Sequence, residues 1–181
     1  MRLAFGEHTV EVHSWETKQA LLDFLSTCEA GSVVLGAHAE QHKVFYSAYV
    51  HLGWSGLRRF GIGVCSEGHG LVPHLFLQPE RLILIVGFNS EVVAVNVQTG
   101  KIGFQFALDA LFRSFVFLSQ HKVMLIFHEI GVLAVSECGE ELWRYDRDTI
   151  ESCVISEERL RLQFLDAPPV QLSITSGTVG V

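Results

Sequence analysis

The sequence predicts a mainly β protein in which antiparallel four-stranded sheets repeat along the chain, with one α-helix near the N-terminus. Helical spacing of apolar residues marks one segment, residues 15–28. Short apolar runs separated by polar or glycine-containing turns fill most of the remaining chain. Two stretches, VVAVNVQTGKIGFQF (residues 92–106) and GVLAVSECGEELWRYD (residues 131–146), follow the same layout, which indicates an internal repeat.

The N-terminal segment is predicted to form a β-hairpin followed by the helix. Residues 2–5 and 9–13 alternate apolar and polar side chains on either side of a short glycine-containing turn. Ser14 is a suitable N-cap for a helix over residues 15–28, and Gly31 is a suitable stop. The side chains that recur at helical spacing are Leu21, Phe24, Leu25 and Cys28.

The repeats divide the chain into an N-terminal cap, residues 1–31, and a β-repeat domain, residues 32–181. Three repeats carry a glycine at the same turn, Gly100, Gly139 and Gly177, spaced 39 and 38 residues apart. Glycine suits this turn because a tight hairpin often needs a positive backbone φ. The first repeat is degenerate because its second half is rich in glycine. The repeats cover about residues 32–73, 74–114, 115–152 and 153–181.

Each of the last three repeats is predicted to be a four-stranded meander. The third repeat supplies the runs FVFL, VMLIF, VLAVS and ELWRY, joined by short polar turns. The last repeat supplies CVIS, LRLQFL, VQLSI and TVGV. A sheet of this kind cannot bury both faces alone, so neighbouring sheets are expected to stack.

The stretch from residue 92 resembles the repeat of quinoprotein-like (pyrroloquinoline-quinone-type) or WD-type β-propellers. In that repeat a strand rich in small residues, a T-G-K turn and an aromatic strand recur. The resemblance covers roughly residues 74–181 and implies a small or partial β-propeller, but it leaves the function open. The chain departs from the family because Phe104 and Val179 stand where Trp143 stands in one repeat. The matching residues are Ala94, Thr99, Gly100, Lys101 and Phe104, then Gly131, Ala134, Gly139 and Trp143.

The number of repeats leaves three arrangements open. Propellers close with about four to eight blades, and quinoprotein dehydrogenases resemble this chain only blade by blade because they use many more. The chain is therefore a minimal ring, a partial ring with an open edge, or a stack of sheets capped by the helix. An open edge strand invites pairing, so self-association through such an edge is one expected contact.

The composition bounds the class of protein. Hydrophobic residues make up 49% of the chain and the mean hydropathy is +0.31, which predicts extensive burial. No apolar run reaches the ~18 residues needed to span a bilayer. The N-terminus lacks the basic start and continuous apolar stretch of a secretory signal, so we expect a cytoplasmic protein. Wide spacing favours reduced, mostly buried thiols for Cys28, Cys65, Cys138 and Cys153.

The charge distribution indicates the kind of partner. The net charge is -7, and the acidic residues concentrate in the last third of the chain. This excludes a nucleic-acid partner, which needs a basic surface. A basic protein partner would suit the acidic surface.

The predicted binding surface lies in the third repeat. Tryptophan and tyrosine are enriched at interface hot spots, although packing in the core is the competing interpretation for Trp143. The predicted binding residues are Trp143, Tyr145, Glu140, Glu141, Asp146 and Asp148.

A second candidate site is a divalent-metal site at His38, Glu40 and His42. These side chains alternate, so on a strand they would point the same way, and imidazole with carboxylate suits zinc or iron. A polar turn is the competing interpretation. No serine or cysteine lies in a context that would activate a nucleophile, so no catalytic residue is predicted.

Two functions from different classes follow. The first is a non-enzymatic protein-binding module without a cofactor, such as an inhibitor or an immunity-type protein. The alternative is a ligand-binding or metal-binding, enzyme-like domain that uses the histidine-rich segment 38–74.

Overall fold

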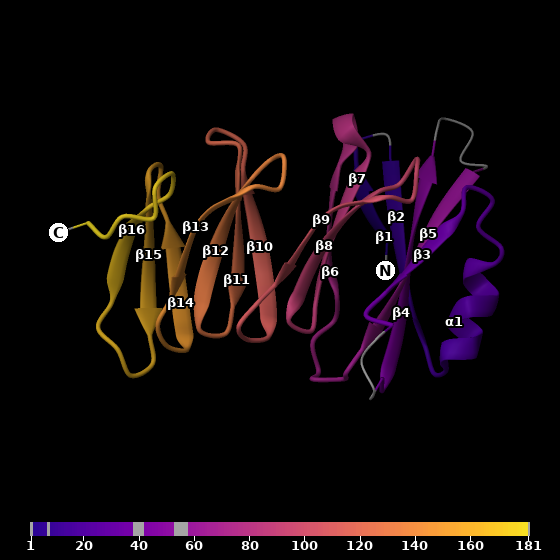
Figure 1. Ribbon diagram of the computed structural model, residues 1–181, viewed down its shortest axis with the longest axis horizontal. Coiled ribbons are helices and arrows are strands. Elements are labelled where there is room, and N and C mark those ends of the chain that lie inside the picture. Colours follow the sequence, from indigo (N-terminus) through magenta and orange to yellow (C-terminus); the bar gives the residue numbers. More distant parts are fainter. Residues whose placement is uncertain (1, 7, 38–41, 53–57, 181) are drawn as a thin grey trace. The chain divides into compact units, whose positions relative to one another are not determined.

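The computed structural model describes residues 2–6, 8–37, 42–52 and 58–180 (Figure 1). It is mainly β, with 58% of the described residues in strands, and the described part contains one α-helix and four sheets. The predicted fold class is confirmed. The chain forms two compact units, residues 1–106 (unit 1) and residues 107–181 (unit 2). The expected division at residue 31 falls inside unit 1 and stays a prediction.

Unit 1 begins with a five-stranded sheet in the order β1-β2-β4-β5-β3. Neighbouring strands are antiparallel except β3, which runs parallel to β5. The predicted hairpin is confirmed, and its second strand is longer than expected. The strands are β1 (Arg2–Phe5), β2 (His8–Trp15), β3 (Ser32–Leu35), β4 (Val44–Leu52) and β5 (Arg58–Ser66).

The helix α1 (Lys18–Leu25) packs on one face of this sheet. It is shorter than predicted, and the prediction of Ser14 as its N-cap is wrong. Because β2 continues to Trp15, the helix starts one turn later and is capped by Thr17. The Thr17 hydroxyl accepts a hydrogen bond from the Ala20 N–H at 3.1 Å.

Two glycines of β5 allow α1 to lie close to the sheet. A Cβ added to Gly61 would lie 2.7 Å from Cys28 Sγ and 2.8 Å from a methyl carbon of Leu25. A Cβ added to Gly63 would lie 2.8 Å from Leu25 and 3.1 Å from Leu21. The glycine-rich second half of the first repeat, which the sequence marked as degenerate, thus contains a nine-residue strand, β5. It joins β1 and β2 in one sheet instead of completing a separate four-stranded meander.

The second sheet of unit 1 is a meander in the order β6-β7-β8-β9, as predicted. Its apolar side chains Leu84 and Val93 share one core with Val10 and Ile62 of the five-stranded sheet. The strands are β6 (His74–Gln78), β7 (Ile83–Phe88), β8 (Glu91–Asn96) and β9 (Ile102–Ala107), with a short 3-10 turn η1 (Pro79–Arg81) before β7.

Unit 2 consists of a four-stranded meander and a three-stranded sheet that share a second core. The predicted strand TVGV is wrong, because this segment makes a single bridge, from Val179 to Leu172. The strands are β10 (Phe112–Leu118), β11 (Val123–His128), β12 (Gly131–Ser136), β13 (Glu141–Asp146), β14 (Ile150–Ile155), β15 (Arg159–Phe164) and β16 (Val170–Ser173).

The three repeat glycines adopt the conformation that the sequence predicts. The φ angles of Gly100, Gly139 and Gly177 are 69°, 85° and 66°, in the region that favours glycine. Each glycine N–H closes its turn by donating to a carbonyl of the preceding strand, at 2.8, 3.0 and 2.9 Å respectively. Among the described residues, no helix has the length and apolar character needed to cross a membrane.

Candidate functional site

Four turns meet at one end of unit 2, the upper end in Figure 1, which we call the acidic end. Glu137 N–H donates to Lys122 O at 3.0 Å and joins the first two turns. Ile174 N–H donates to Glu158 O at 3.0 Å and joins the last two. The four turns are residues 119–122, 137–140, 156–158 and 174–178.

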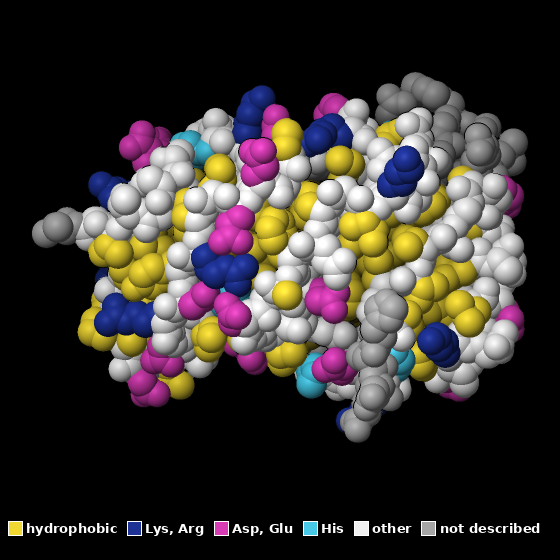
Figure 2. Space-filling model, in the orientation of Figure 1, with side chains coloured by type: hydrophobic (Ala, Val, Ile, Leu, Met, Phe, Trp, Pro, Cys, Tyr) yellow, Lys and Arg dark blue, Asp and Glu magenta, His cyan; other side chains and the backbone are white. Residues whose placement is uncertain are grey.

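Carboxylates outnumber cationic groups at the acidic end, and Figure 2 shows Asp and Glu side chains there. Lys122 Nζ lies 3.3 Å from Glu137 Oε1, and Arg144 Nη2 lies 3.5 Å from Glu141 Oε2. The acidic end has five carboxylates when Glu141, the first residue of β13, is included, and the other three form no hydrogen bond or ion pair with a described residue. They belong to Glu140, Glu157 and Glu158.

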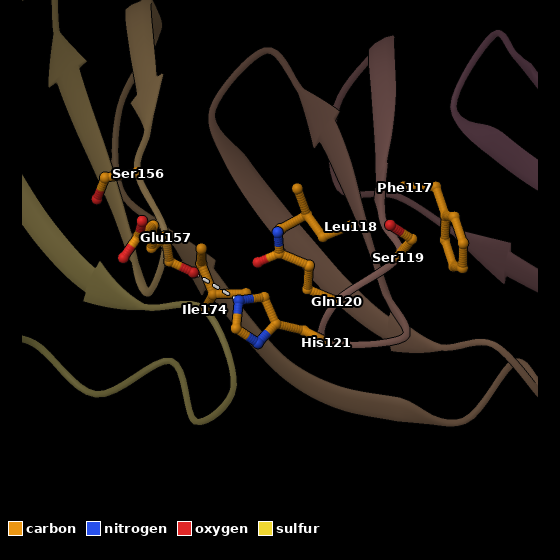
Figure 3. A pocket seen from close by; sticks show the side chains of 8 residues that line it. All are labelled: Phe117, Leu118, Ser119, Gln120, His121, Ser156, Glu157 and Ile174. Atoms are coloured by element: carbon orange, nitrogen blue, oxygen red, sulfur yellow. Dashed lines mark hydrogen bonds between the residues drawn. The ribbon is translucent and has the colours of Figure 1, made fainter.

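A pocket of about 240 Å³ opens between two of these turns (Figure 3). A ring nitrogen of His121, Nε2, lies 2.5 Å from the backbone oxygen of Glu157 and links the turns. Gln120 extends toward Glu157 from the opposite turn (Figure 3). The lining residues are Phe117, Leu118, Ser119, Gln120, His121, Ser156, Glu157 and Ile174.

The structure places the two predicted aromatic binding residues against the core of unit 2. Trp143 is 9% exposed, and its indole N–H donates to Ile174 O at 2.8 Å. The Tyr145 ring is partly buried, with its centroid 6.4 Å from that of Phe164. Little of the Trp143 ring is therefore left for a partner, and a binding role for this residue stays a prediction.

The predicted acidic binding residues divide between the two ends of β13. Glu140 and Glu141 lie at the acidic end. Asp146 lies at the other end, 2.9 Å from Nε2 of the fully buried His128, whose pKa is lowered by burial against the opposing effect of Asp146. The carboxylate of Asp148 accepts hydrogen bonds at 2.7 and 3.1 Å from the backbone N–H groups of Thr149 and Asp166.

A second polar cluster lies on the face of the five-stranded sheet. The Tyr49 hydroxyl donates to Glu11 Oε2 at 2.6 Å, and His51 Nε2 and Arg2 Nε lie 3.4 and 3.7 Å from Glu11 Oε1. The His13 ring stacks on Tyr49 with centroids 5.7 Å apart. The hydrogen bond from Tyr49 lowers the pKa of Glu11, while burial and this bond raise the pKa of Tyr49 to about 12.

The repeats have counterparts among solved structures but not among known sequence families. No protein-family model and no curated sequence matches the chain. The crystal structure of Sqt1 from Saccharomyces cerevisiae resembles it with a TM-score of 0.50 and 15% identity, over 80% of this chain and 45% of Sqt1. This likeness concerns the fold and supports repeats of the WD- or propeller-like type.

Two further structures are similar at lower scores. The computationally designed Ika8 protein has a TM-score of 0.49 at 15% identity, over 75% of this chain and 44% of Ika8. The Pan2 WD40 domain from Neurospora crassa has a TM-score of 0.47 at 12% identity, over 63% of this chain and 38% of the Pan2 chain. This chain spans less than half the length of Sqt1, and a likeness at this identity concerns the fold alone. The predicted propeller-type repeats are confirmed in this sense, while the quinoprotein resemblance stays a prediction.

The candidate metal site lies largely outside the described residues, since His38 and Glu40 belong to the part that the structure does not describe. The His42 ring is 6.2 Å from the Phe45 ring and makes no hydrogen bond with a described residue. Within the described ranges, no three His, Cys, Asp or Glu side chains gather as metal ligands. The metal site stays a prediction.

None of the four cysteines forms a disulfide with a described residue, and the expectation of mostly buried thiols holds for half of them. Cys28 and Cys65 are buried, and burial raises the pKa of both thiols. Cys138, in the turn 137–140, and Cys153, in β14, are exposed.

Two groups of site residues were missed in the sequence. The pocket residues of the turn 119–121 carried no pattern, because the pocket forms only when two turns distant in sequence meet. The polar cluster around Glu11, in contrast, has a recognisable sequence pattern. In TVEVHSW, period-two alternation puts Glu11, His13 and Trp15 on one face of a strand.

Proposed function

We propose that the chain is a non-enzymatic protein-binding module that holds a basic partner at the acidic end of unit 2. The observation that carries this proposal is Leu142, which stays 44% exposed beside the carboxylates of Glu140 and Glu141. An apolar side chain within a polar rim is the usual anatomy of a protein interface.

The edge position of β13 supports the same surface. In the strand order of its sheet β13 comes last, so one side of its backbone has no neighbouring strand within the sheet. An extended segment of another chain can pair with such an edge through main-chain hydrogen bonds. Leu142 and the adjacent carboxylates would then give the pairing its specificity.

The charge of unit 2 supports a basic partner. It has eleven acidic and six basic residues, a net charge of -5 out of -7 for the chain. Opposite charge speeds association and makes it sensitive to salt, because ions screen exposed charges beyond about 10 Å at 0.1 M ionic strength. An inhibitor or immunity-type role in the cytoplasm is part of this proposal.

Selection from a phage-displayed random peptide library tests the proposal. We expect selected peptides to be rich in Arg and Lys, and to bind less tightly in high salt. The variant carrying Glu140→Gln, Glu141→Gln and Leu142→Ser should bind the selected peptides about tenfold more weakly, as expected for removal of an interface anchor with its rim. The readout is fluorescence anisotropy.

The matched control carries Glu16→Gln, Asp23→Asn and Leu22→Ser in unit 1. It changes the net charge by the same amount and also removes an exposed leucine, since Leu22 is 38% exposed. Equal weakening by the two variants would show that only overall charge matters and would overturn the proposal. Failure to select any basic peptide would do the same.

A second copy of the chain is another occupant of the β13 edge. The same triple variant separates this case by sedimentation velocity at high protein concentration. If the wild-type chain dimerises and the variant does not, the edge serves self-association. If both are monomers, the edge is available for a different protein.

A further inference from the structure

We infer that the pocket at the acidic end receives the side chain of an arginine from the partner protein. This inference rests on the proposed function and names the group that the partner inserts. The pocket lies between the turns 119–121 and 156–157, so it opens among the carboxylates that would attract a basic chain.

The size of the pocket favours a single side chain. Its volume is about 240 Å³, below the ~300 to 1,000 Å³ usual for drug-sized ligands. Its walls include Leu118 and Ile174, and Ile174 is only 1% exposed because it also belongs to the core. Apolar walls suit the aliphatic stem of a long cationic side chain, which can bury its carbons and leave its charged tip at polar groups.

The polar lining offers acceptor atoms without a partner in the described part of the chain: a carboxylate, a hydroxyl oxygen and an amide oxygen. The carboxylate of Glu157 has no partner among the described residues, and neither the hydroxyl of Ser119 nor the amide of Gln120 is engaged with one. No lysine or arginine lines the pocket. A bound group rich in donors and positive charge would therefore complete the lining.

His121 links the turn that carries it to the backbone of Glu157. Because the backbone oxygen of Glu157 can only accept, the contact at 2.5 Å requires a proton on Nε2 of His121. In the neutral ring the other nitrogen, Nδ1, is then an acceptor. A planar guanidinium has five donors and can pair with the Glu157 carboxylate through two parallel hydrogen bonds, which an ammonium group cannot do.

The test compares two neighbouring carboxylates of equal charge. Glu157 lines the pocket, whereas Glu158 does not. For an arginine-containing peptide selected as above, E157Q should weaken binding about tenfold, and E158Q by less than about twofold, since one exposed charge contributes little. Replacement of the peptide arginine by citrulline, which is nearly isosteric but neutral, should weaken binding by a similar factor. For the E157Q variant, replacing the peptide arginine by citrulline should weaken binding little further, because both changes remove the same interaction.

A second probe reports the location directly. In ¹H–¹⁵N spectra of the full chain, N-acetyl-arginine amide should shift the backbone signals of residues 119–121 and 157. The matching citrulline compound should not.

The outcomes separate this inference from the proposed function. If the β13 variant weakens peptide binding while E157Q and E158Q behave alike, the module stands and the arginine pocket is wrong. If no peptide is selected but the arginine amide shifts signals at the pocket, the pocket binds free arginine, and the proposed protein-binding function is wrong. If the arginine amide shifts nothing and E157Q has no effect, the inference is overturned.

Discussion

Glu11 shows how much one carboxylate organises on the face of the five-stranded sheet. Its carboxylate accepts a hydrogen bond from the Tyr49 hydroxyl at 2.6 Å. It also faces the cationic Arg2 and the protonatable His51. The pKa of Glu11 is lowered in the folded chain, so its contribution to stability is present above pH 4.5 and is lost as the pH falls through the folded value. The pKa of Tyr49 is raised, so its contribution is present below pH 10 and is lost toward pH 12.

Replacement of Tyr49 by phenylalanine is predicted to reduce the free energy of unfolding by about 1 to 2 kcal/mol at pH 7, because a hydrogen bond to a charged group is lost. The difference from the wild-type chain should be largest between pH 4.5 and 10 and should shrink on either side. Urea unfolding at several pH values measures it. The control is Tyr46→Phe on the same strand, whose hydroxyl makes no hydrogen bond with a described residue. A pH-independent loss, or an equal loss in the control, would contradict the assignment.

At the scale of elements, the contact between α1 and β5 depends on the absence of two side chains. Gly61→Ala and Gly63→Ala are each predicted to cost about 1 to 3 kcal/mol, the usual range for overpacking. The reason is that the new Cβ would lie within 3 Å of Leu25, which is buried between helix and sheet. Thermal unfolding followed by circular dichroism measures the loss.

The control for these variants is Gly103→Ala in β9, where the nearest atom would be 3.8 Å away. It should change stability by less than about 0.5 kcal/mol, as surface substitutions commonly do. Combining Gly63→Ala with Leu25→Ala should cost less than the sum of the two single changes, because both act on one contact. Additive losses would show that the glycine does not serve the helix.

The same contact explains which elements the sequence could predict. The strands of the meanders were predictable because each pairs with its neighbour in sequence across a short turn. The β5 strand was not predictable, because its glycines are needed for close packing against a helix more than thirty residues earlier in the sequence. The parallel pairing of β3 with β5 is likewise non-local. The helix start was misplaced because nothing local shows that β2 pairs with β4 as far as Trp15.

The candidate site follows the same rule. Glu140 and Glu141 were predicted as binding residues because an acidic surface suits a basic partner. Glu157 was not, because its importance depends on the contact between its turn and His121, 36 residues away in sequence. A sequence therefore indicates which side chains carry charge, while the hydrogen bonds between turns decide which of them share a surface.

At the scale of the whole molecule, the charge is unevenly divided, with a net charge of -2 in unit 1 and -5 in unit 2. The carboxylates at the acidic end that have no partner among the described residues repel one another, which reduces the stability of the folded chain. A surface of this kind is expected if the proposed function is right, because binding surfaces often reduce stability.

The combined variant Glu140→Gln, Glu157→Gln and Glu158→Gln is predicted to be more stable than the wild-type chain by about 0.5 kcal/mol at low ionic strength. The gain should vanish near 1 M salt, where the screening length falls to about 3 Å. Thermal unfolding across a salt series measures both. A loss of stability at low salt would mean that these carboxylates have stabilising partners after all.

The hydrogen bond from the Trp143 indole to Ile174 has a practical consequence. Indole emission responds to the polarity and mobility of its surroundings. Ile174 lines the pocket, and its backbone carbonyl accepts the hydrogen bond from the Trp143 indole. The fluorophore is therefore separated from a ligand in the pocket by one residue. Trp143 is thus an optical probe of the acidic end, and replacing Trp15 and Trp54 by phenylalanine would leave its emission as the only indole signal.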